Sequence, residues 1–302
     1  MKNLIKGILS TPMTPFDTNG NLALDKIEPF VAWQSANGVK GFYILGTWGG
    51  FALLSLEERR NVAEAYATAS KKHNMQLMIH IGSHSYKETI ELGKHAIENG
   101  ATAISLTVPG YYSTGGYLKM DDYKRYFGGI AEKLDSPLFL YNNPRTTNVL
   151  FEPSEFVELV KVGVYGVKDG SKNIAWVLKT QNYLKDAGLK AEIIPGNSVG
   201  ILYAFLYGCT AVTSGASVVF PNESAKILSL LTDNKYSEAA EQHRLVLKLR
   251  EAMSICSAPP SSAHYLLSET NHDLGLPRDI WPSINDVKGI ELKKIISKVL
   301  NE

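Results

Sequence analysis

Lys168 is the residue with the clearest capacity for covalent chemistry, because it closes a short apolar run over residues 164–167. A run of this kind is typical of a buried strand, so the sequence predicts an amine at a strand end. Burial disfavours the charged form of an amine, and a neutral amine can condense with a ketone to form a Schiff base. In the alternative interpretation, the stem of Lys168 lies along apolar surface while its ammonium group reaches solvent.

Phenols, a hydroxyl and a glycine that could assist such an amine follow other apolar runs. Phenols and hydroxyls move protons, and glycines expose backbone N–H groups to an anion. Each of these residues also has a structural interpretation, the tyrosines as core aromatics and the threonine as a turn hydroxyl. The residues are Thr47, Tyr112, Tyr141 and Gly196.

The elements that position these residues alternate regularly along the chain. Helices are predicted over 55–70, 86–98 and 174–185, the first with a capping-box pattern in Ser55 and Glu58. Eight apolar runs separated by helical stretches predict an α/β fold, a TIM (β/α)8 barrel rather than an open doubly wound sheet. The predicted strands are 7–9, 41–45, 77–81, 103–107, 138–141, 164–168, 192–195 and 211–214.

The strand signals cease after Pro221, and the remaining chain has a helical pattern. We therefore predict a barrel over residues 1–222 that carries the active site, and a C-terminal helical layer over residues 223–302. Because chemistry in this fold collects where strands lead into helices, the residues named above should meet at one rim. Helices of the C-terminal layer are predicted over 237–254, 261–268 and 288–300.

Composition limits the partners of the protein. The net charge is +1, with 31 Lys and Arg against 30 Asp and Glu, which gives no electrostatic case for nucleic acid or an anionic membrane. The two cysteines, Cys209 and Cys256, lack metal-ligand spacing and are too few for a disulfide scaffold. No secretory signal or membrane-spanning stretch is present in the sequence, so we expect a cytoplasmic protein.

Four stretches resemble motifs of the dihydrodipicolinate synthase/N-acetylneuraminate lyase family, and the resemblance runs from about Gly7 to the end. Residues 46–50, Gly-Thr-Trp-Gly-Gly, are similar to the family's Gly-Thr-Thr-Gly-Glu loop, and residues 54–59 to its Leu-Ser/Thr-x-x-Glu-Arg. Residues 141–144, Tyr-Asn-Asn-Pro, are similar to its Tyr-Asn-x-Pro. Residues 166–169, Gly-Val-Lys-Asp, are similar to its Gly-hydrophobic-Lys-Asp/Glu. The order and the spacing of the motifs also agree.

The resemblance implies a pyruvate-dependent Schiff-base enzyme with no further cofactor and no metal. It implies that Lys168 forms the imine, that Tyr141 transfers protons, and that Thr47 links this phenol to a relay. It also implies that Tyr112 is lent to the site of a neighbouring subunit, in a tight dimer that pairs into a homotetramer. Gly196 and Val212 lie where the family has its seventh and eighth strand ends, and both are expected to bind substrate.

Departures from the family pattern bear on the substrate. Trp48 and Gly50 replace the second Thr and the Glu of the glycine loop, so backbone N–H groups must carry more of the binding of a substrate carboxylate. Thr146 stands where the synthase branch has an arginine, and Arg145 should point to the opposite side if the segment is extended. With Asn143, Thr146 suits a polyhydroxylated substrate.

The pattern of these site residues is closest to that of the family's 2-keto-3-deoxygluconate aldolases, which also lack the arginine. We therefore expect retro-aldol cleavage of a 2-keto-3-deoxy sugar acid to pyruvate and an aldehyde such as glyceraldehyde. The alternatives on the same scaffold are 4-hydroxy-tetrahydrodipicolinate synthase and N-acetylneuraminate lyase.

Other classes of protein are weaker alternatives. Ser198 lies in a Gly-x-Ser-x-Gly pattern, with Asp233 and either His243 or His264 downstream in the order of a serine hydrolase. A metal-dependent enzyme could use His80 and His84, but His80 falls in a predicted strand and acidic ligands are missing nearby. A non-catalytic regulator built on the same barrel is a further alternative.

Overall fold

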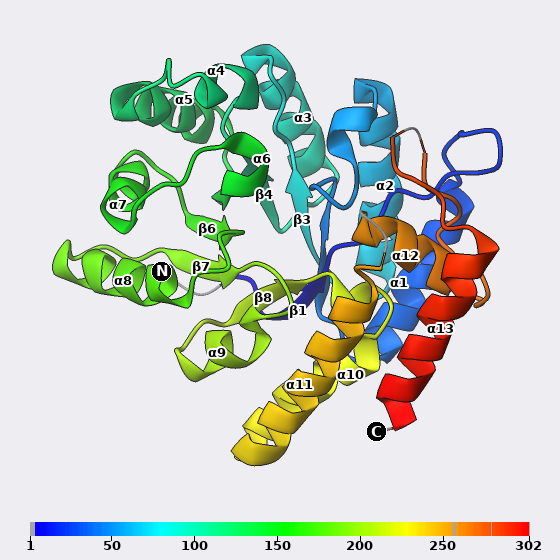
Figure 1. Cartoon of the computed structure of the whole chain (residues 1–302). Helices are drawn as coiled ribbons and strands as arrows, with labels where there is room; N and C mark the ends of the chain where they lie inside the picture. Colours follow the sequence, from blue (N-terminus) through cyan, green and yellow to red (C-terminus); the bar gives the residue numbers. More distant parts are fainter. Residues whose placement is uncertain (1–3, 256–257, 279, 302) are drawn as a thin grey trace. The chain divides into compact units, whose positions relative to one another are not determined.

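The structure is a computed structural model that describes residues 4–255, 258–278 and 280–301. Within these residues, eight parallel strands form a nearly closed barrel surrounded by helices, which confirms the predicted TIM barrel (Figure 1). The strands follow the order β7-β6-β5-β4-β3-β2-β1-β8. They are β1 (Gly7–Ser10), β2 (Gly41–Ile44), β3 (Gln76–His80), β4 (Ala103–Leu106), β5 (Leu138–Asn142), β6 (Gly166–Asp169), β7 (Glu192–Pro195) and β8 (Ala211–Ser214).

Predicted and observed strands differ only at their ends, and the largest difference is at β6. The prediction begins at Val164, whereas β6 begins at Gly166. The amide of Val164 instead donates to the carbonyl of Leu159 at 3.1 Å and closes the preceding helix, after Gly163 has taken a φ of 105°. Val164 is therefore part of a helix C-terminus, where glycine supplies the left-handed conformation.

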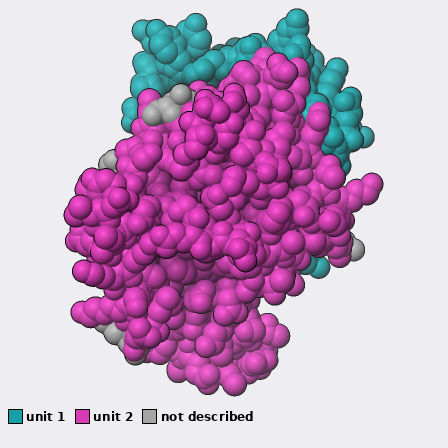
Figure 2. Space-filling model, turned by 90° about the vertical axis from the view of Figure 1, so that its right-hand side faces the viewer, with its two compact units in different colours: residues 1–6, 78–213 teal, residues 7–77, 214–302 magenta. Residues whose placement is uncertain are grey.

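The chain divides into two compact units, which are coloured in Figure 2. Unit 1 comprises residues 1–6 and 78–213, and it contains β4 to β7 with the residues from Met78 of β3 and up to Thr213 of β8. Its helices are α3 (Tyr86–Glu98), α4 (Gly110–Thr114), α5 (Met120–Lys133), α6 (Pro144–Thr147), α7 (Pro153–Lys161), α8 (Ile174–Asp186) and α9 (Gly200–Leu206).

Unit 2 comprises residues 7–77 and 214–302, and it contains β1 and β2. Its 3-10 turns are η1 (Leu24–Lys26), η2 (Phe51–Leu53) and η3 (Ala216–Val218). Its helices are α1 (Ile27–Ala36), α2 (Leu56–Lys72), α10 (Pro221–Thr232), α11 (Tyr236–Ala252), α12 (Pro259–Leu267) and α13 (Asp286–Asn301). Helices α11, α12 and α13 confirm the three predicted C-terminal helices. The division of the chain at residues 222 and 223 stays a prediction.

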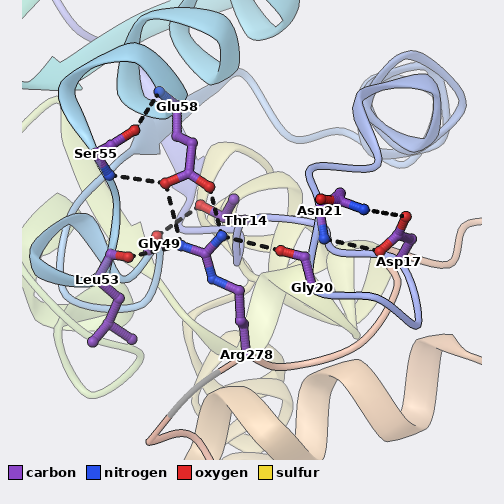
Figure 3. A network of polar contacts seen from close by, with 9 residues as sticks. All are labelled: Thr14, Asp17, Gly20, Asn21, Gly49, Leu53, Ser55, Glu58 and Arg278. Carbon is purple, nitrogen blue, oxygen red and sulfur yellow. Dashed lines mark hydrogen bonds and ion pairs between the residues drawn. The ribbon is translucent and has the colours of Figure 1, made fainter.

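A polar network in unit 2 fixes the segment between the glycine loop and α2 (Figure 3). Ser55 and Glu58 form the predicted capping box, with the Ser55 hydroxyl accepting from the Glu58 amide and the Glu58 carboxylate accepting from the Ser55 amide. The guanidinium of Arg278 donates to this carboxylate at 2.5 Å, to the carbonyl of Leu53 at 2.7 Å and to that of Gly20 at 3.1 Å. The C-terminal segment thus holds the start of α2.

Two observations concern membrane-spanning helices and the cysteines. Helices long and apolar enough to cross a membrane are absent from the described part of the chain. Cys209 is a buried free cysteine, and burial raises the pKa of its thiol to about 12. Cys256, the other cysteine considered above, lies outside the described residues.

Candidate active site

Lys168 and Tyr141 meet at the ends of neighbouring strands. They are registered partners of β6 and β5, and registered residues of a parallel pair point to the same face. The Nζ atom of Lys168 lies 3.6 Å from the centroid of the Tyr141 ring, so the amine rests on the face of the phenol ring. Lys168 is 6% exposed and Tyr141 is 7% exposed. The alternative in which the amine extends into bulk solvent is therefore wrong.

The strand register identifies the other residues on this face of unit 1. His80 pairs with Ser105 and Ser105 with Phe139, which lies two residues before Tyr141. Lys168 pairs with Ile194, and Gly196, two residues later, bridges to Thr213. Because side chains alternate along a strand, a polar set shares one face. The set is His80, Ser105, Tyr141, Lys168 and Thr213.

His80, considered above as a metal ligand, belongs to this set. Its ring is fully buried, and its Nε2 atom accepts a hydrogen bond from the Thr107 amide at 3.4 Å. The ring stands edge-on to Tyr141, with 6.1 Å between centroids. His84 lies in an exposed loop after β3, and no group of three or more His, Cys, Asp or Glu side chains within the described ranges could hold a metal ion. His80 instead forms a wall beside the phenol.

Gly196 lies directly beside Lys168. Its amide donates to the carbonyl of Asp169 at 2.5 Å. A Cβ atom added to Gly196 would stand 2.4 Å from that carbonyl oxygen and 3.2 Å from Cε of Lys168. The absence of a side chain at this position therefore leaves room for the lysine and for anything bonded to it.

Asp169 follows Lys168 on the opposite face of β6. Its carboxylate accepts from the Asn142 side-chain amide at 3.1 Å and from the Ser171 amide and hydroxyl at 3.2 and 2.8 Å. Burial is the largest influence on this carboxyl group and raises its pKa to about 6, although these hydrogen bonds and Lys168 favour the charged form. The network joins the ends of β5 and β6 from behind the amine.

The segment after Tyr141 is not extended. The condition under which Arg145 was expected to point to the side opposite Thr146 is therefore not met. Pro144 begins the short helix α6, as proline commonly does at the first helical position. Arg145 and Thr146 are both exposed and, as neighbours in a helix, differ in direction by about 100° rather than pointing to opposite sides. The Thr146 hydroxyl accepts from the Asn143 side-chain amide at 2.8 Å, and Asn143 itself is buried.

Tyr112 and Val212 do not add side chains to this cluster. Tyr112 lies on α4, is 57% exposed, and contacts the ring of Tyr111 with centroids 5.2 Å apart. The side chain of Val212 packs toward Gly200 of α9, where an added Cβ would meet it at 3.5 Å. Val212 neighbours Thr213 in β8, so their side chains point to opposite faces. A contribution of Val212 to binding would have to come from its backbone.

Thr47 and Trp48 lie in unit 2, in a tightly folded loop after β2. Leu45 has a left-handed φ of 55°, and an added Cβ on Gly49 would stand 2.9 Å from its amide nitrogen. The Trp48 ring lies against Gly215 and within 5.4 Å of the Arg250 guanidinium carbon. Thr47 is half-buried, and its carbonyl accepts from the Gly50 amide at 3.3 Å.

Gly50 has a φ of 64°, a conformation that L side chains rarely adopt. A glutamate at this position, as in the resembling motif, would therefore be strained in this loop. Glycine therefore suits the backbone conformation of this loop.

Ser198 lacks the geometry of a hydrolase nucleophile. It lies between β7 and α9 as predicted, but it is 2% exposed, and the strained residue of the turn is Asn197, with a φ of 89°. In a nucleophile elbow the serine itself occupies the strained turn and is exposed. His264 is engaged with the carbonyl of Gly275 at 2.9 Å, and burial lowers its pKa to about 4.

Comparisons with known proteins identify the family of the chain. Residues 4–278 match the dihydrodipicolinate synthetase family. The chain belongs to this family. Its members are class I, pyruvate-dependent aldolase-type enzymes, so the protein is an enzyme of this type.

Similar members of the dihydrodipicolinate synthetase family carry different names. A 4-hydroxy-tetrahydrodipicolinate synthase of Methanocaldococcus jannaschii is 28% identical, with 99% of each chain covered. The putative 2-dehydro-3-deoxy-D-gluconate aldolase YagE of Escherichia coli is 25% identical, with 86% of this chain and 89% of the relative covered. A crystal structure of YagE with pyruvate has a TM-score of 0.89 at 23% identity, with 99% of each chain covered. The structure of a Ruminococcus gnavus sialic acid aldolase has a TM-score of 0.86 at 22% identity, with 99% of each chain covered.

Sequence reasoning missed three members of the polar face. His80 was considered only as a metal ligand, and Ser105 and Thr213 were not considered. The signal for Thr213 is the alternation within β8, which places Ala211 and Thr213 on the face opposite Val212. Its pairing with Gly196 could be found only from the register of the strands.

Proposed function

We propose that the protein cleaves a 2-keto-3-deoxy sugar acid, preferentially 2-keto-3-deoxygluconate, to pyruvate and an aldehyde such as glyceraldehyde. The single observation that supports it most is the buried amine of Lys168 resting on the ring of Tyr141. An amine can attack a ketone, and the adjacent phenol is a group that can exchange a proton.

In the proposed reaction, Lys168 attacks C2 of the keto acid and water leaves, which forms a protonated imine. Tyr141 accepts the proton of the C4 hydroxyl. The C3–C4 bond then breaks, its electron pair enters the imine as an enamine, and the aldehyde departs. A proton returns to C3, and water hydrolyses the imine to release pyruvate and the free amine. The imine supplies the polarisation, so the proposal includes no further cofactor.

The preference for a hydroxylated substrate is supported by Asn143 and Thr146. These uncharged groups are hydrogen bonded to each other at the start of α6, where the synthase branch has an arginine. Hydroxyl groups pair well with such partners. The name of the Escherichia coli relative is consistent with the same substrate.

A second candidate is 4-hydroxy-tetrahydrodipicolinate synthase. Arg145 is exposed on the same short helix as Thr146, so a cation for a substrate carboxylate is one residue away. Relatives with this name share 25–28% of the sequence. N-acetylneuraminate lyase is a further alternative on the same scaffold.

The assay that separates these candidates measures pyruvate formed from 2-keto-3-deoxygluconate and from N-acetylneuraminate, and pyruvate consumed with aspartate semialdehyde. We expect the highest kcat/KM with 2-keto-3-deoxygluconate, and loss of turnover in Lys168→Ala. A higher kcat/KM with aspartate semialdehyde would support the synthase instead. Arg145→Ala should then lower that activity, whereas it should leave cleavage of the sugar acid unchanged.

We also propose a homotetramer, a dimer of dimers, in which Tyr112 completes the site of a neighbouring subunit. The exposure of Tyr112 and Tyr111 on α4 supports such a contact, because large exposed aromatic side chains often mark interfaces. A cytoplasmic location stays a prediction from composition.

A further inference from the structure

Two buried polar atoms at the ends of β7 and β8 have no hydrogen-bond partner within the residues that the structure describes. They are Nδ2 of Asn197 and the hydroxyl oxygen of Thr213. The two residues are neighbours, because the Asn197 amide donates to the carbonyl of Thr213 at 2.8 Å. Buried polar groups are nearly always paired, so two unpaired atoms on residues with hydrogen-bonded backbones require an explanation.

The backbone and side chain of Asn197 are held in a defined orientation. Its φ of 89° is unfavourable for most side chains, although asparagine tolerates it better than others. Its Oδ1 atom accepts from the Val199 amide at 2.9 Å, and its carbonyl accepts from the Gly200 amide at 3.0 Å. With Oδ1 committed to Val199, the Nδ2 group is presented as a fixed donor.

Thr213 faces the same side of the sheet as Lys168. Gly196 lies between them, directly after β7; it is bridged to Thr213, and a Cβ added to it would stand 3.2 Å from Cε of Lys168. Two strand spacings separate β6 from β8, about 10 Å, and the intervening residue has no side chain. A short carbon chain bonded to Lys168 can extend over Gly196 toward Thr213.

We propose that the side-chain amide of Asn197 and the hydroxyl of Thr213 form a subsite for the hydroxyl groups of the sugar-acid chain joined to Lys168. The inference rests on the proposed function and adds the residues that select a hydroxylated chain. A side-chain amide donor and a hydroxyl can both pair with a substrate hydroxyl, which donates and accepts. A site with buried polar groups rejects an analogue that leaves them unpaired.

Thr213→Val tests the subsite, because valine keeps the shape of threonine and removes the hydroxyl. We measure kcat/KM for condensation of pyruvate with glyceraldehyde and with propanal. The selectivity ratio is the value for glyceraldehyde divided by the value for propanal. The ratio should fall about tenfold in Thr213→Val, the loss expected for one hydrogen bond. Thr180→Val is the matched control, since the Thr180 hydroxyl is also buried but bonds within α8. Its ratio should equal that of the wild type.

Thermal unfolding without substrate separates binding from structure. Thr213→Val should unfold at the same or a higher temperature, because it removes an unpaired buried hydroxyl. A lower unfolding temperature with an unchanged ratio would assign Thr213 a structural role and overturn the subsite. Asn197→Asp, which keeps the acceptor for Val199 and removes the donor, should also lower the ratio; an unchanged ratio in both variants would contradict the proposal.

Borohydride reduction with pyruvate distinguishes failure of the subsite from failure of the function. If wild-type protein forms the reduced adduct and the ratio is unchanged in the variants, the subsite alone is wrong. If wild-type protein forms no adduct, the proposed aldolase chemistry is wrong and the subsite falls with it.

Discussion

Asp169 is a buried carboxyl group one residue after Lys168, and its pKa in the folded protein is about 6, against 3.8 for an exposed aspartate. Between these values the unfolded chain is ionised while the folded chain retains the proton. The contribution of Asp169 to stability is therefore fully present below pH 3.8 and is lost as the pH rises through about 6. The protein carries this unfavourable charge at neutral pH, directly behind its amine.

Asp169→Asn should remove this pH dependence. We expect the free energy of unfolding, measured with urea at several pH values between 4 and 7, to fall less with rising pH in the variant than in the wild type. Asp121→Asn, at an exposed position of α5, is the control and should follow the wild type. Parallel curves for wild type and Asp169→Asn would show that Asp169 does not titrate in this range.

Gly196→Ala should lower the stability of the fold and crowd the side chain of Lys168. The added Cβ would stand 2.4 Å from the Asp169 carbonyl oxygen, so β6 and β7 must separate. We expect a loss of about 1–3 kcal/mol in the free energy of unfolding, the usual cost of overpacking. Gly110→Ala is the control, because an added Cβ there has no atom within 4 Å. Equal stability of Gly196→Ala and wild type in urea denaturation would contradict the close approach.

Much of the candidate site could be predicted because it depends on strand ends. Lys168 and Tyr141 each close an apolar run, and consecutive parallel strands bring such residues together. The direction of Arg145 could not be predicted, because Pro144 starts a one-turn helix that the sequence pattern does not require. Thr213 was missed because its importance depends on the register between β7 and β8 rather than on its own segment.

At the scale of elements, Arg278 connects the C-terminal segment to the start of α2 and to the turn at Gly20 (Figure 3). The hydrogen bond from Arg278 is the largest influence on the carboxyl group of Glu58 and lowers its pKa. The stabilising contribution of Glu58 is therefore present above the pKa that this carboxyl group has in the unfolded chain. It is lost as the pH falls through the lower pKa that the group has in the folded chain.

Arg278→Leu should destabilise unit 2 by about 2–4 kcal/mol, because it removes the cation paired with the Glu58 carboxylate and the donor to two carbonyl groups. Arg244→Leu is the control, since Arg244 makes an exposed ion pair with Glu241 and its loss should cost less than about 1 kcal/mol. Urea denaturation near neutral pH measures both. A similar loss in the two variants would assign the Arg278 network no special contribution.

The elements themselves were predicted best where a local signal ends them. The capping box at Ser55 begins α2, and Gly100 and Gly188 follow helices with φ of 81° and 65°. Apolar periodicity alone could not separate the end of α7 from β6, because Val164 is buried in either assignment. A hydrogen bond to Leu159 decides between the two.

At the scale of the whole molecule, periodicity and strand count were sufficient for the barrel. The oligomeric state could not be predicted from such patterns, because an exposed aromatic residue on α4 does not by itself identify the surface that covers it. The proposed sharing of Tyr112 between subunits has a direct test by complementation.

Lys168→Ala and Tyr112→Ala should each be nearly inactive alone. Mixed under conditions that exchange subunits, they should regain about a quarter of wild-type turnover, because one site in each mixed dimer combines an intact lysine with a partner's intact phenol. Sedimentation velocity should find tetramers in all samples. Inactive mixed dimers would contradict the sharing of Tyr112.

The most direct test of the whole account is the covalent one. Protein incubated with pyruvate and reduced with borohydride should gain the mass of a single reduced pyruvate per chain, and peptide mapping should place it on Lys168. Lys168→Ala should gain nothing, and Lys172→Ala, which alters a nearby lysine outside the strand, should react like wild type. An unmodified wild-type chain, or an adduct that persists in Lys168→Ala, would contradict Lys168 as the imine-forming residue.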